Sequence, residues 1–325
     1  MQTSASLAIA QVLAHCGGSP GGAVMFLGQA ITGRPDDLEP YEQLAELRRE
    51  SPDEVAAAVR APRELWQFVA GAYLDFLDGD MDRAVQRLGS VTGYRPTVAW
   101  ASAPWFSEER FSGAVTAAGL TDAVLNITDY NPELDNDEAR ERLRPWFRLI
   151  DVVCDLDPAA DPMARMAILL RVCGLTDESF ALCDRADSVE RVMFTEVVRA
   201  GTWRRIGERR QAGEAFRRAI ELDPANWSLY LDLADLVAED GDFTTAAELV
   251  RQGLEHEPGD VTLRAAGAAY RARAENSHAD LDLLLELAPM LPHAGYRNGL
   301  LEHALGATGL PADRIAAARR LQADG

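Results

Sequence analysis

The sequence predicts an all-α fold built from repeated helical hairpins, and two observations support this prediction. Pro224, Pro258 and Pro292 stand 34 residues apart, and each follows an amphipathic stretch with the period of a helix. No stretch with the two-residue period of a β-strand is long enough to predict a sheet. A fixed period of this length is typical of arrays in which each helical pair packs mainly on its neighbours.

Small or apolar residues precede the three prolines at two constant distances, except that Asp280 replaces the small residue in the third unit. These distances are those of a helix pair that is repeated in register. The residues 12 positions before a proline are Ala212, Ala246 and Asp280, and those 8 positions before are Phe216, Val250 and Leu284.

This pattern resembles the tetratricopeptide repeat, whose 34-residue unit places small residues where two helices cross and a proline after the second helix. In the best-matching unit, 227–260, Tyr230 stands at the family's Trp position and Leu233 and Ala234 stand at its Leu-Gly pair. The resemblance implies a right-handed solenoid of helical hairpins. It is clearest over residues 193–294, with units that start at 193, 227 and 261, and it extends over residues 160–192 and 65–98.

The remaining segments depart from the repeat. Residues 23–31 and 41–49 are helical stretches separated by Pro and Gly breaks. Pro145 interrupts a helical pattern, so we expect a new helix or a kink there. The sequence therefore predicts an N-terminal helical region with degenerate repeats (1–98), an irregular central insertion (99–159), the tetratricopeptide repeats (160–294) and a C-terminal cap with a capping helix (295–325).

The composition excludes several classes of enzyme. All 32 basic residues are Arg and there is no Lys. A Schiff-base lysine, an internally bound pyridoxal cofactor and the lysine of a phosphate-binding loop are therefore excluded. Replacement of every Lys by Arg in an Ala-rich chain indicates a GC-rich bacterial gene.

The charge balance is strongly acidic, with a formal net charge of −20. Such a surface repels nucleic-acid backbones and anionic membranes, so neither is expected as a partner. The apolar stretch from Leu7 to Ala14 lacks the preceding basic residue of a secretory signal, and no apolar run approaches the roughly 20 residues that span a bilayer. We expect a cytoplasmic protein.

No motif for a metal or a cofactor is present, and none is expected. The four cysteines, at positions 16, 154, 173 and 183, form no CxxC pair and are expected to be reduced and buried. The aspartates of residues 151–161 have the spacing of metal ligands, and Asp129, Asp135 and Asp137 form a second group. However, Leu156-Asp157-Pro158 repeats the helix stop at Leu222-Asp223-Pro224. The helix stop is the preferred interpretation, and a magnesium site is the alternative.

A run of arginines is the one local exception to the acidic charge. Seven Arg fall between Arg199 and Arg218, around Trp203. In the resembled family the first helix of each unit lines a concave groove, which implies that Arg204 and Arg205 line it. Arg forks match carboxylates, so this groove would suit an acidic segment or an anionic small molecule. The alternative is that these Arg pair with nearby Glu and Asp. The predicted groove residues are Arg165, Arg171, Trp203, Arg204, Arg205 and Arg273.

Three aromatic residues mark the central segment. Trp100, Trp105 and Phe106 lie in a Pro-broken stretch between the repeat-like halves. They would either line a ligand pocket or fill the seam where the array changes geometry.

These patterns favour a scaffold that binds a segment of another protein. The carboxylate clamp of some family members is not supported, because the chain has no Lys and has Gly201, Asp235 and Ala269 at the expected Asn positions. The alternative is an enzyme, or the obligate helper of one, in a bacterial biosynthetic pathway, with its site in residues 99–159. Self-association into a homo-oligomer is a third possibility, and no catalytic residue is identified.

Overall fold

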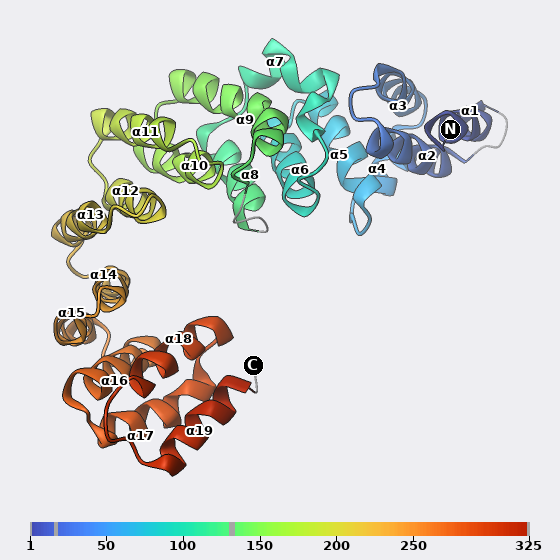
Figure 1. Ribbon diagram of the computed structural model, residues 1–325. Helices are drawn as coiled ribbons and strands as arrows, with labels where there is room; N and C mark the ends of the chain where they lie inside the picture. The colour runs from blue at the N-terminus through green and yellow to red at the C-terminus, as the bar shows by residue number, and fades with distance from the viewer. Residues whose placement is uncertain (1, 16–18, 130–133, 324–325) are drawn as a thin grey trace. The chain divides into compact units, whose positions relative to one another are not determined.

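The computed structural model describes residues 2–15, 19–129 and 134–323, with backbone alone for residues 2–5, 14 and 15. Every regular element in these ranges is a helix. The chain divides into two compact units, Met1–Val198 and Arg199–Gly325 (Figure 1). This confirms the predicted all-α class.

The first unit is a row of helices in which α5 packs on α6, α6 on α8, α8 on α10 and α10 on α11. Figure 1 shows these helices side by side. Its elements are α1 Gln2–His15, α2 Pro20–Gly33, α3 Leu38–Glu50, α4 Pro52–Val59, α5 Leu65–Asp78, α6 Met81–Tyr94, η1 Trp100–Ser102, η2 Pro104–Ser107, α7 Glu109–Ser112, α8 Ala117–Asp129, α9 Asp137–Leu156, α10 Ala160–Val172, α11 Thr176–Val189 and the beginning of α12 Met193–Arg205.

The second unit continues with the end of α12 and with helices that pack in chain order from α13 to α17. Helix α18 packs on α16, and α19 packs on α18 and α17. The elements are α13 Arg209–Leu222, α14 Trp227–Glu239, α15 Phe243–His256, α16 Val261–Glu275, α17 His278–Leu287, η3 Ala288–Met290, α18 Ala294–Leu305 and α19 Ala312–Ala323.

The predicted repeat frame coincides with the observed helices. Helices begin at Leu65, Ala160, Met193, Trp227 and Val261, which are the first residues of the five predicted units. Side-chain caps explain two of these starts, because Asn226 accepts a hydrogen bond from the amide of Ser228 (3.3 Å) and Asp260 from that of Leu263 (2.8 Å).

The turn inside a hairpin is also a property of the local sequence. Gly79 and Gly241 have positive φ angles of 82° and 86°, and a left-handed residue of this kind ends a helix without the penalty that a Cβ imposes. Helices α6 and α15 begin two residues after these glycines. Asp80 accepts a hydrogen bond from the amide of Arg83 (3.2 Å), and Asp242 accepts one from the amide of Thr245 (3.0 Å). The Gly-Asp pairs therefore set the hairpin turns.

The central segment contradicts one of the two outcomes expected at Pro145, the start of a new helix. Helix α9 does not begin at Pro145 but at Asp137, where Asn136 accepts a hydrogen bond from the amide of Ala139 (2.8 Å). The helix continues through Pro145 because it has a buried apolar face that runs from Ala139 to Cys154 and includes Trp146. Packing thus offsets the loss of one helical hydrogen bond at the proline.

The contact between α6 and α8 is unusually close. A Cβ added at Gly89 would lie 2.5 Å from the carbonyl oxygen of Ala123, and one added at Gly93 would collide with that of Asn126. Only glycine allows the two helix backbones to approach this closely. Helix α8 therefore packs directly on α6.

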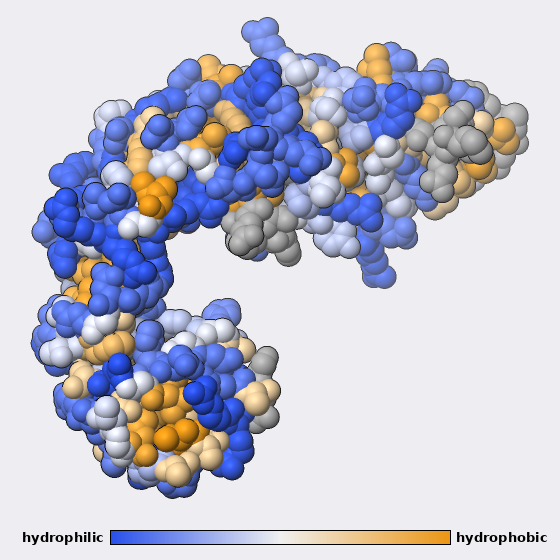
Figure 2. Space-filling view, in the orientation of Figure 1, coloured by the Kyte–Doolittle hydropathy of each residue, from blue (hydrophilic) through white to orange (hydrophobic). Residues whose placement is uncertain are grey.

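The buried core is apolar, and the described cysteines belong to it. Cys154, Cys173 and Cys183 are buried, and burial raises the pKa of the Cys154 thiol to about 11. Cys16 lies outside the described residues. Hydrophilic residues cover most of the face seen in Figure 2, with one apolar area on the second unit. Among the described helices, none is both long enough and apolar enough to cross a bilayer.

Candidate functional site

The predicted groove arginines divide between the two units. Arg165 and Arg171 lie on α10 in the first unit. Nε of Arg165 donates to Oδ2 of Asp161 at 2.7 Å, and its guanidinium carbon lies 4.4 Å from the ring centroid of Phe194. Arg171 stands half-buried in the last turn of α10. These two residues thus belong to a surface of the first unit.

Trp203, Arg204 and Arg205 lie in the last turns of α12, in the second unit. Arg204 forms an ion pair with Glu239 at the end of α14. Trp203 packs half-buried against the core formed by α12, α13 and α14. Arg205 is exposed. The positive charge of Arg204 is therefore largely compensated at this place, as the pairing alternative predicts.

Arg273 lies in the last turn of α16, with its guanidinium 5.5 Å from the ring centroid of Phe243. The ring of His303, from α18, lies 5.4 Å from the same phenylalanine ring, edge to face. Burial lowers the pKa of His303, which favours the neutral imidazole. This end of the second unit is therefore aromatic as well as basic.

The most organised polar group of the second unit is centred on Asp235 of α14. Its Oδ1 accepts a hydrogen bond from the hydroxyl of Tyr270, on α16, and a second one, of 3.0 Å, from the hydroxyl of Tyr296, on α18. Helices α14, α16 and α18, which are the first helices of three successive hairpins, thus meet at one carboxylate oxygen. We call Asp232, Asp235, Tyr270 and Tyr296 the Asp235 network.

The surroundings of the Asp235 network disfavour the charged forms of its two carboxyl groups. Burial raises the pKa of Asp235, and the hydrogen bonds from the two tyrosines oppose that shift. Burial, together with repulsion from Asp235, raises the pKa of Asp232 to about 6, although Arg204 opposes the rise. Among the described residues, none donates a hydrogen bond to the Asp232 carboxylate. The network can therefore accept hydrogen bonds and a positive charge.

Sequence reasoning did not identify the Asp235 network as a site. Asp235 drew attention only because it stands at the position of a family asparagine. A signal was nevertheless present, because Asp232 and Asp235 are three residues apart and so share one face of α14. The two tyrosines lie 35 and 61 residues beyond Asp235, and no local pattern connects residues so far apart.

The three predicted pocket aromatics lie in the first unit, among buried rings. Trp100, Trp105 and Phe106 are each less than 5% exposed. The ring of Trp105 lies 5.1 Å from that of Phe76, and the ring of Phe106 lies 5.0 Å from that of Trp146. Trp100 and Trp105 pack in the core, whereas Phe106 also borders a recess of about 420 Å³ beside Pro145.

Several of the acidic groups in residues 135–161 have structural partners. Asp157 accepts a hydrogen bond from the first amide of α8, at Ala117 (3.0 Å), and Asp155 forms an ion pair with Arg185 (2.6 Å). Asp137 pairs with Arg140 at 2.9 Å. In the described ranges no group of three or more potential ligands could hold a metal ion.

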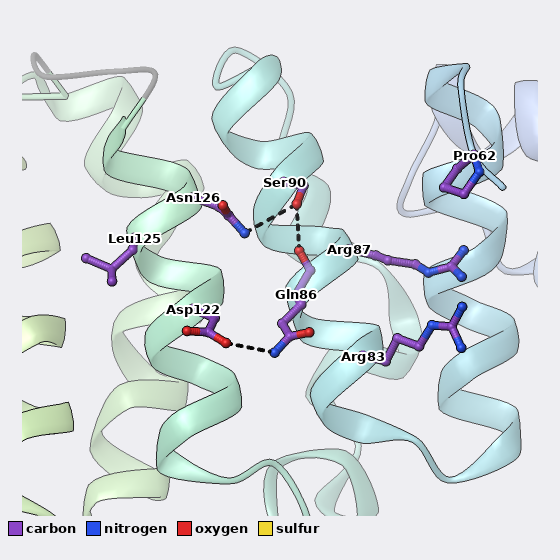
Figure 3. Close-up of a pocket in the computed structure, with 8 residues that line it drawn as sticks. All are labelled: Pro62, Arg83, Gln86, Arg87, Ser90, Asp122, Leu125 and Asn126. Carbon is purple, nitrogen blue, oxygen red and sulfur yellow. Dashed lines mark hydrogen bonds between the residues drawn. The ribbon is translucent and has the colours of Figure 1, made fainter. Parts of the chain in front are cut away.

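A second polar site lies on the first unit, between α6 and α8. It is a recess of about 540 Å³ in which Gln86 and Ser90 of α6 bridge to Asp122 and Asn126 of α8 (Figure 3). Nε2 of Gln86 donates to Asp122 at 3.1 Å, and Nδ2 of Asn126 donates to the Ser90 hydroxyl at 3.4 Å. We call this site the α6–α8 recess.

Comparisons with known proteins identify the repeat. Residues 207–270 match the family model described as "Tetratricopeptide repeat". Curated proteins contain no match to this sequence.

Solved structures of repeat proteins resemble the chain at low identity. One, from a study of Pseudomonas aeruginosa pilF, is 13% identical with a TM-score of 0.43 and covers 72% of this chain and 96% of its own. YrrB, described as a TPR protein with an unusual peptide-binding site, is 14% identical with a TM-score of 0.40, covering 70% and 100%. A tetratricopeptide repeat protein from Parabacteroides merdae is 11% identical with a TM-score of 0.41, covering 94% and 99%. At these values the likenesses carry no conclusion about function.

Proposed function

The chain is a tetratricopeptide repeat protein, with the repeats matched over residues 207–270, and from this premise we propose that it is a scaffold that binds a segment of another protein. Repeat arrays of this kind present extended surfaces whose shape is formed before a partner arrives. The function is therefore recognition rather than catalysis. We place the binding surface on the second unit, at α14, α16 and α18.

The Asp235 network is the observation that carries this placement. Asp235 is held by hydroxyl groups from two other helices, so its carboxylate is oriented before any partner binds. A polar group with a fixed orientation loses little entropy on binding, which favours affinity and specificity. The network also joins three hairpins of the array at one point, as expected for a surface that binds an extended segment.

The charges of this surface favour a basic group in the partner. Asp232 and Asp235 share one face of α14, and Asp232 receives no hydrogen bond from the described residues. A guanidinium or ammonium group placed beside Asp232 would relieve the repulsion between the two carboxylates and would supply the missing donors. We therefore propose that an Arg or Lys side chain of the partner binds here.

The arginine pattern led us to expect an acidic segment instead. That expectation has less support at Arg204, because Glu239 already pairs with this residue. Arg209 is likewise engaged, by Asp240 at 2.7 Å. Arg273 remains a candidate for the contact with acidic residues that flank the basic one.

A selection from a random peptide library tests this function. Peptides retained by the full-length protein should be rich in Arg or Lys at one position. They should bind the Asp232→Asn and Asp235→Asn variants roughly 10-fold to 100-fold more weakly, since a charged hydrogen bond contributes about 1.5–3 kcal/mol. Glu255→Gln, on the exposed face of α15, is the matched control and should bind like the wild type. Retained peptides without basic residues, or equal affinity for all variants, would refute the placement.

The enzyme alternative has less support. It places a site in residues 99–159, where Trp100 and Trp105 serve the core. We therefore retain the scaffold as the single proposed function.

A further inference from the structure

The α6–α8 recess contains two arginines that the proposed function does not use. Arg83 and Arg87 lie four residues apart on α6, so their side chains share one face of the helix. Both line the recess, and Figure 3 shows them extending from α6 in the same direction, away from the bridges to α8. The recess belongs wholly to the first unit, so it is separate from the Asp235 network.

Arg87 is built into the unit. It is only 8% exposed, its Nε lies 2.8 Å from Oδ2 of Asp75, and its Nη1 donates to the carbonyl oxygen of Val59 at 3.4 Å. Its guanidinium passes so close to Gly71 that any Cβ at that position would collide with it. Glycine at position 71 thus makes room for a buried cation against α5. Burial lowers the pKa of Arg87 and the neighbouring Asp75 opposes this, so the group stays charged.

Arg83 is differently placed. Its side chain is 53% exposed, and its Nε lies 3.6 Å from the same Oδ2 atom of Asp75 that Arg87 contacts more closely. No described residue accepts a hydrogen bond from its guanidinium. Two guanidinium groups therefore share one carboxylate, and the donors of Arg83 are available to a ligand.

The lining of the recess contains the two guanidinium groups and a single carboxylate, Asp122, which already accepts a hydrogen bond from Gln86. Asp75, which contacts both guanidinium groups, is not part of this lining, so the carboxylate that compensates them lies outside the recess. At an ionic strength of 0.15 M the screening length is about 8 Å, so the charges nearest to the recess dominate its potential.

We propose that the α6–α8 recess binds an oxyanion, a phosphate or a carboxylate group, through the guanidinium groups of Arg83 and Arg87. The planar fork of an arginine matches two oxygens of either group. Arg87, fixed by Asp75 and Gly71, supplies an immobile positive charge, and Arg83 supplies the hydrogen bonds. The oxyanion comes either from a free small molecule or from an acidic group on a larger ligand, and both share this chemistry.

A titration of the full-length protein with inorganic phosphate tests the proposal. Backbone amide signals of residues 81–94 are followed by NMR while chloride keeps the ionic strength constant. We expect saturable shifts at α6, with the dissociation constant raised at least about 10-fold in Arg83→Gln, because one charged donor is lost. Arg83→Lys, which keeps the charge without the fork, should fall between the two. Because Arg83 is half exposed, these variants should fold, and circular dichroism checks that they do.

The control variant is Arg144→Gln, which removes an arginine of similar exposure from α9, outside the recess. It should bind phosphate like the wild type. A parallel titration with acetate compares the two oxyanions, since tighter binding of acetate indicates a carboxylate ligand and tighter binding of phosphate indicates a phosphate ligand. Equal shifts for the wild type and Arg83→Gln, equal shifts with added chloride, or no shift at α6 would overturn the proposal.

Discussion

The hydroxyl of Tyr296 donates a 3.0 Å hydrogen bond to Oδ1 of Asp235, although 61 residues separate the two in the sequence. The same oxygen accepts the hydroxyl of Tyr270 from the helix between them. This pair of contacts connects α14, α16 and α18, so its loss should be felt in all three helices.

Tyr270→Phe is therefore expected to destabilise the second unit by about 1–3 kcal/mol, because a half-buried carboxylate loses one of its two donors. Amide hydrogen exchange resolved by peptide is the suitable measurement, since the hairpins of a repeat array can open independently. Protection should fall in α14, α16 and α18 and stay unchanged in α5 and α6. Unchanged protection in α14 would mean that the hydroxyl does not support the network.

The stability of the second unit should also depend on Asp232. Its pKa rises from 3.8 to about 6 in the folded protein, so the folded state holds this proton more tightly than the unfolded state does. The contribution is present below pH 3.8 and is lost as the pH rises through about 6. Asp232→Asn lacks this titration.

The free energy of unfolding of Asp232→Asn, relative to the wild type, should therefore increase between pH 4 and pH 6 by up to about 3 kcal/mol and then level off. Urea titrations at several pH values measure the difference. Asp240→Asn, an exposed carboxylate at the end of the same helix, is the control. If the difference in the free energy of unfolding between Asp232→Asn and the wild type does not change with pH, the raised pKa is contradicted.

The buried pair of Asp75 and Arg87 allows a double-mutant cycle. Arg87→Met leaves Asp75, which is 9% exposed, with Arg83 at 3.6 Å as its remaining counter-ion, so the single variant should lose about 3–5 kcal/mol. Adding Asp75→Leu removes the uncompensated carboxylate and should restore most of that loss. If the double variant is as unstable as the sum of the singles, the two groups do not interact.

The close contact of α6 with α8 predicts an asymmetric response to alanine. Gly89→Ala would place a methyl group 2.5 Å from a backbone oxygen of α8, so the helices must separate and stability should fall by about 1–3 kcal/mol. Gly299→Ala, inside α18 with no atom within 4 Å of the new carbon, should instead raise stability by about 0.5–1 kcal/mol. Thermal unfolding of both variants checks the contrast, and a stable Gly89→Ala protein would show that α6 and α8 can separate without penalty.

The repeat frame was accessible from the sequence because its signals are local. The prolines, the Gly-Asp turns and the side-chain caps each act within about four residues, so the starts of the helices at Trp227 and Val261 follow from adjacent residues. ELDP at 221–224 is such a signal, since α13 ends at Leu222 and α14 starts at Trp227. The new helix that was one of two expectations at Pro145 is absent for the opposite reason, because the burial of one face of α9 outweighs the local preference of a proline.

The two sites could be identified only from the tertiary structure. The arginine run indicated a basic surface, but the sequence did not reveal that Glu239, 35 residues away, pairs with Arg204. Nor did it connect Asp235 with Tyr270 and Tyr296, or Arg87 with Gly71 and Asp75. Local chemistry therefore determined the helices and their register, whereas the packing of one helix on another decided which charged groups are paired, which are buried and which remain available to a partner.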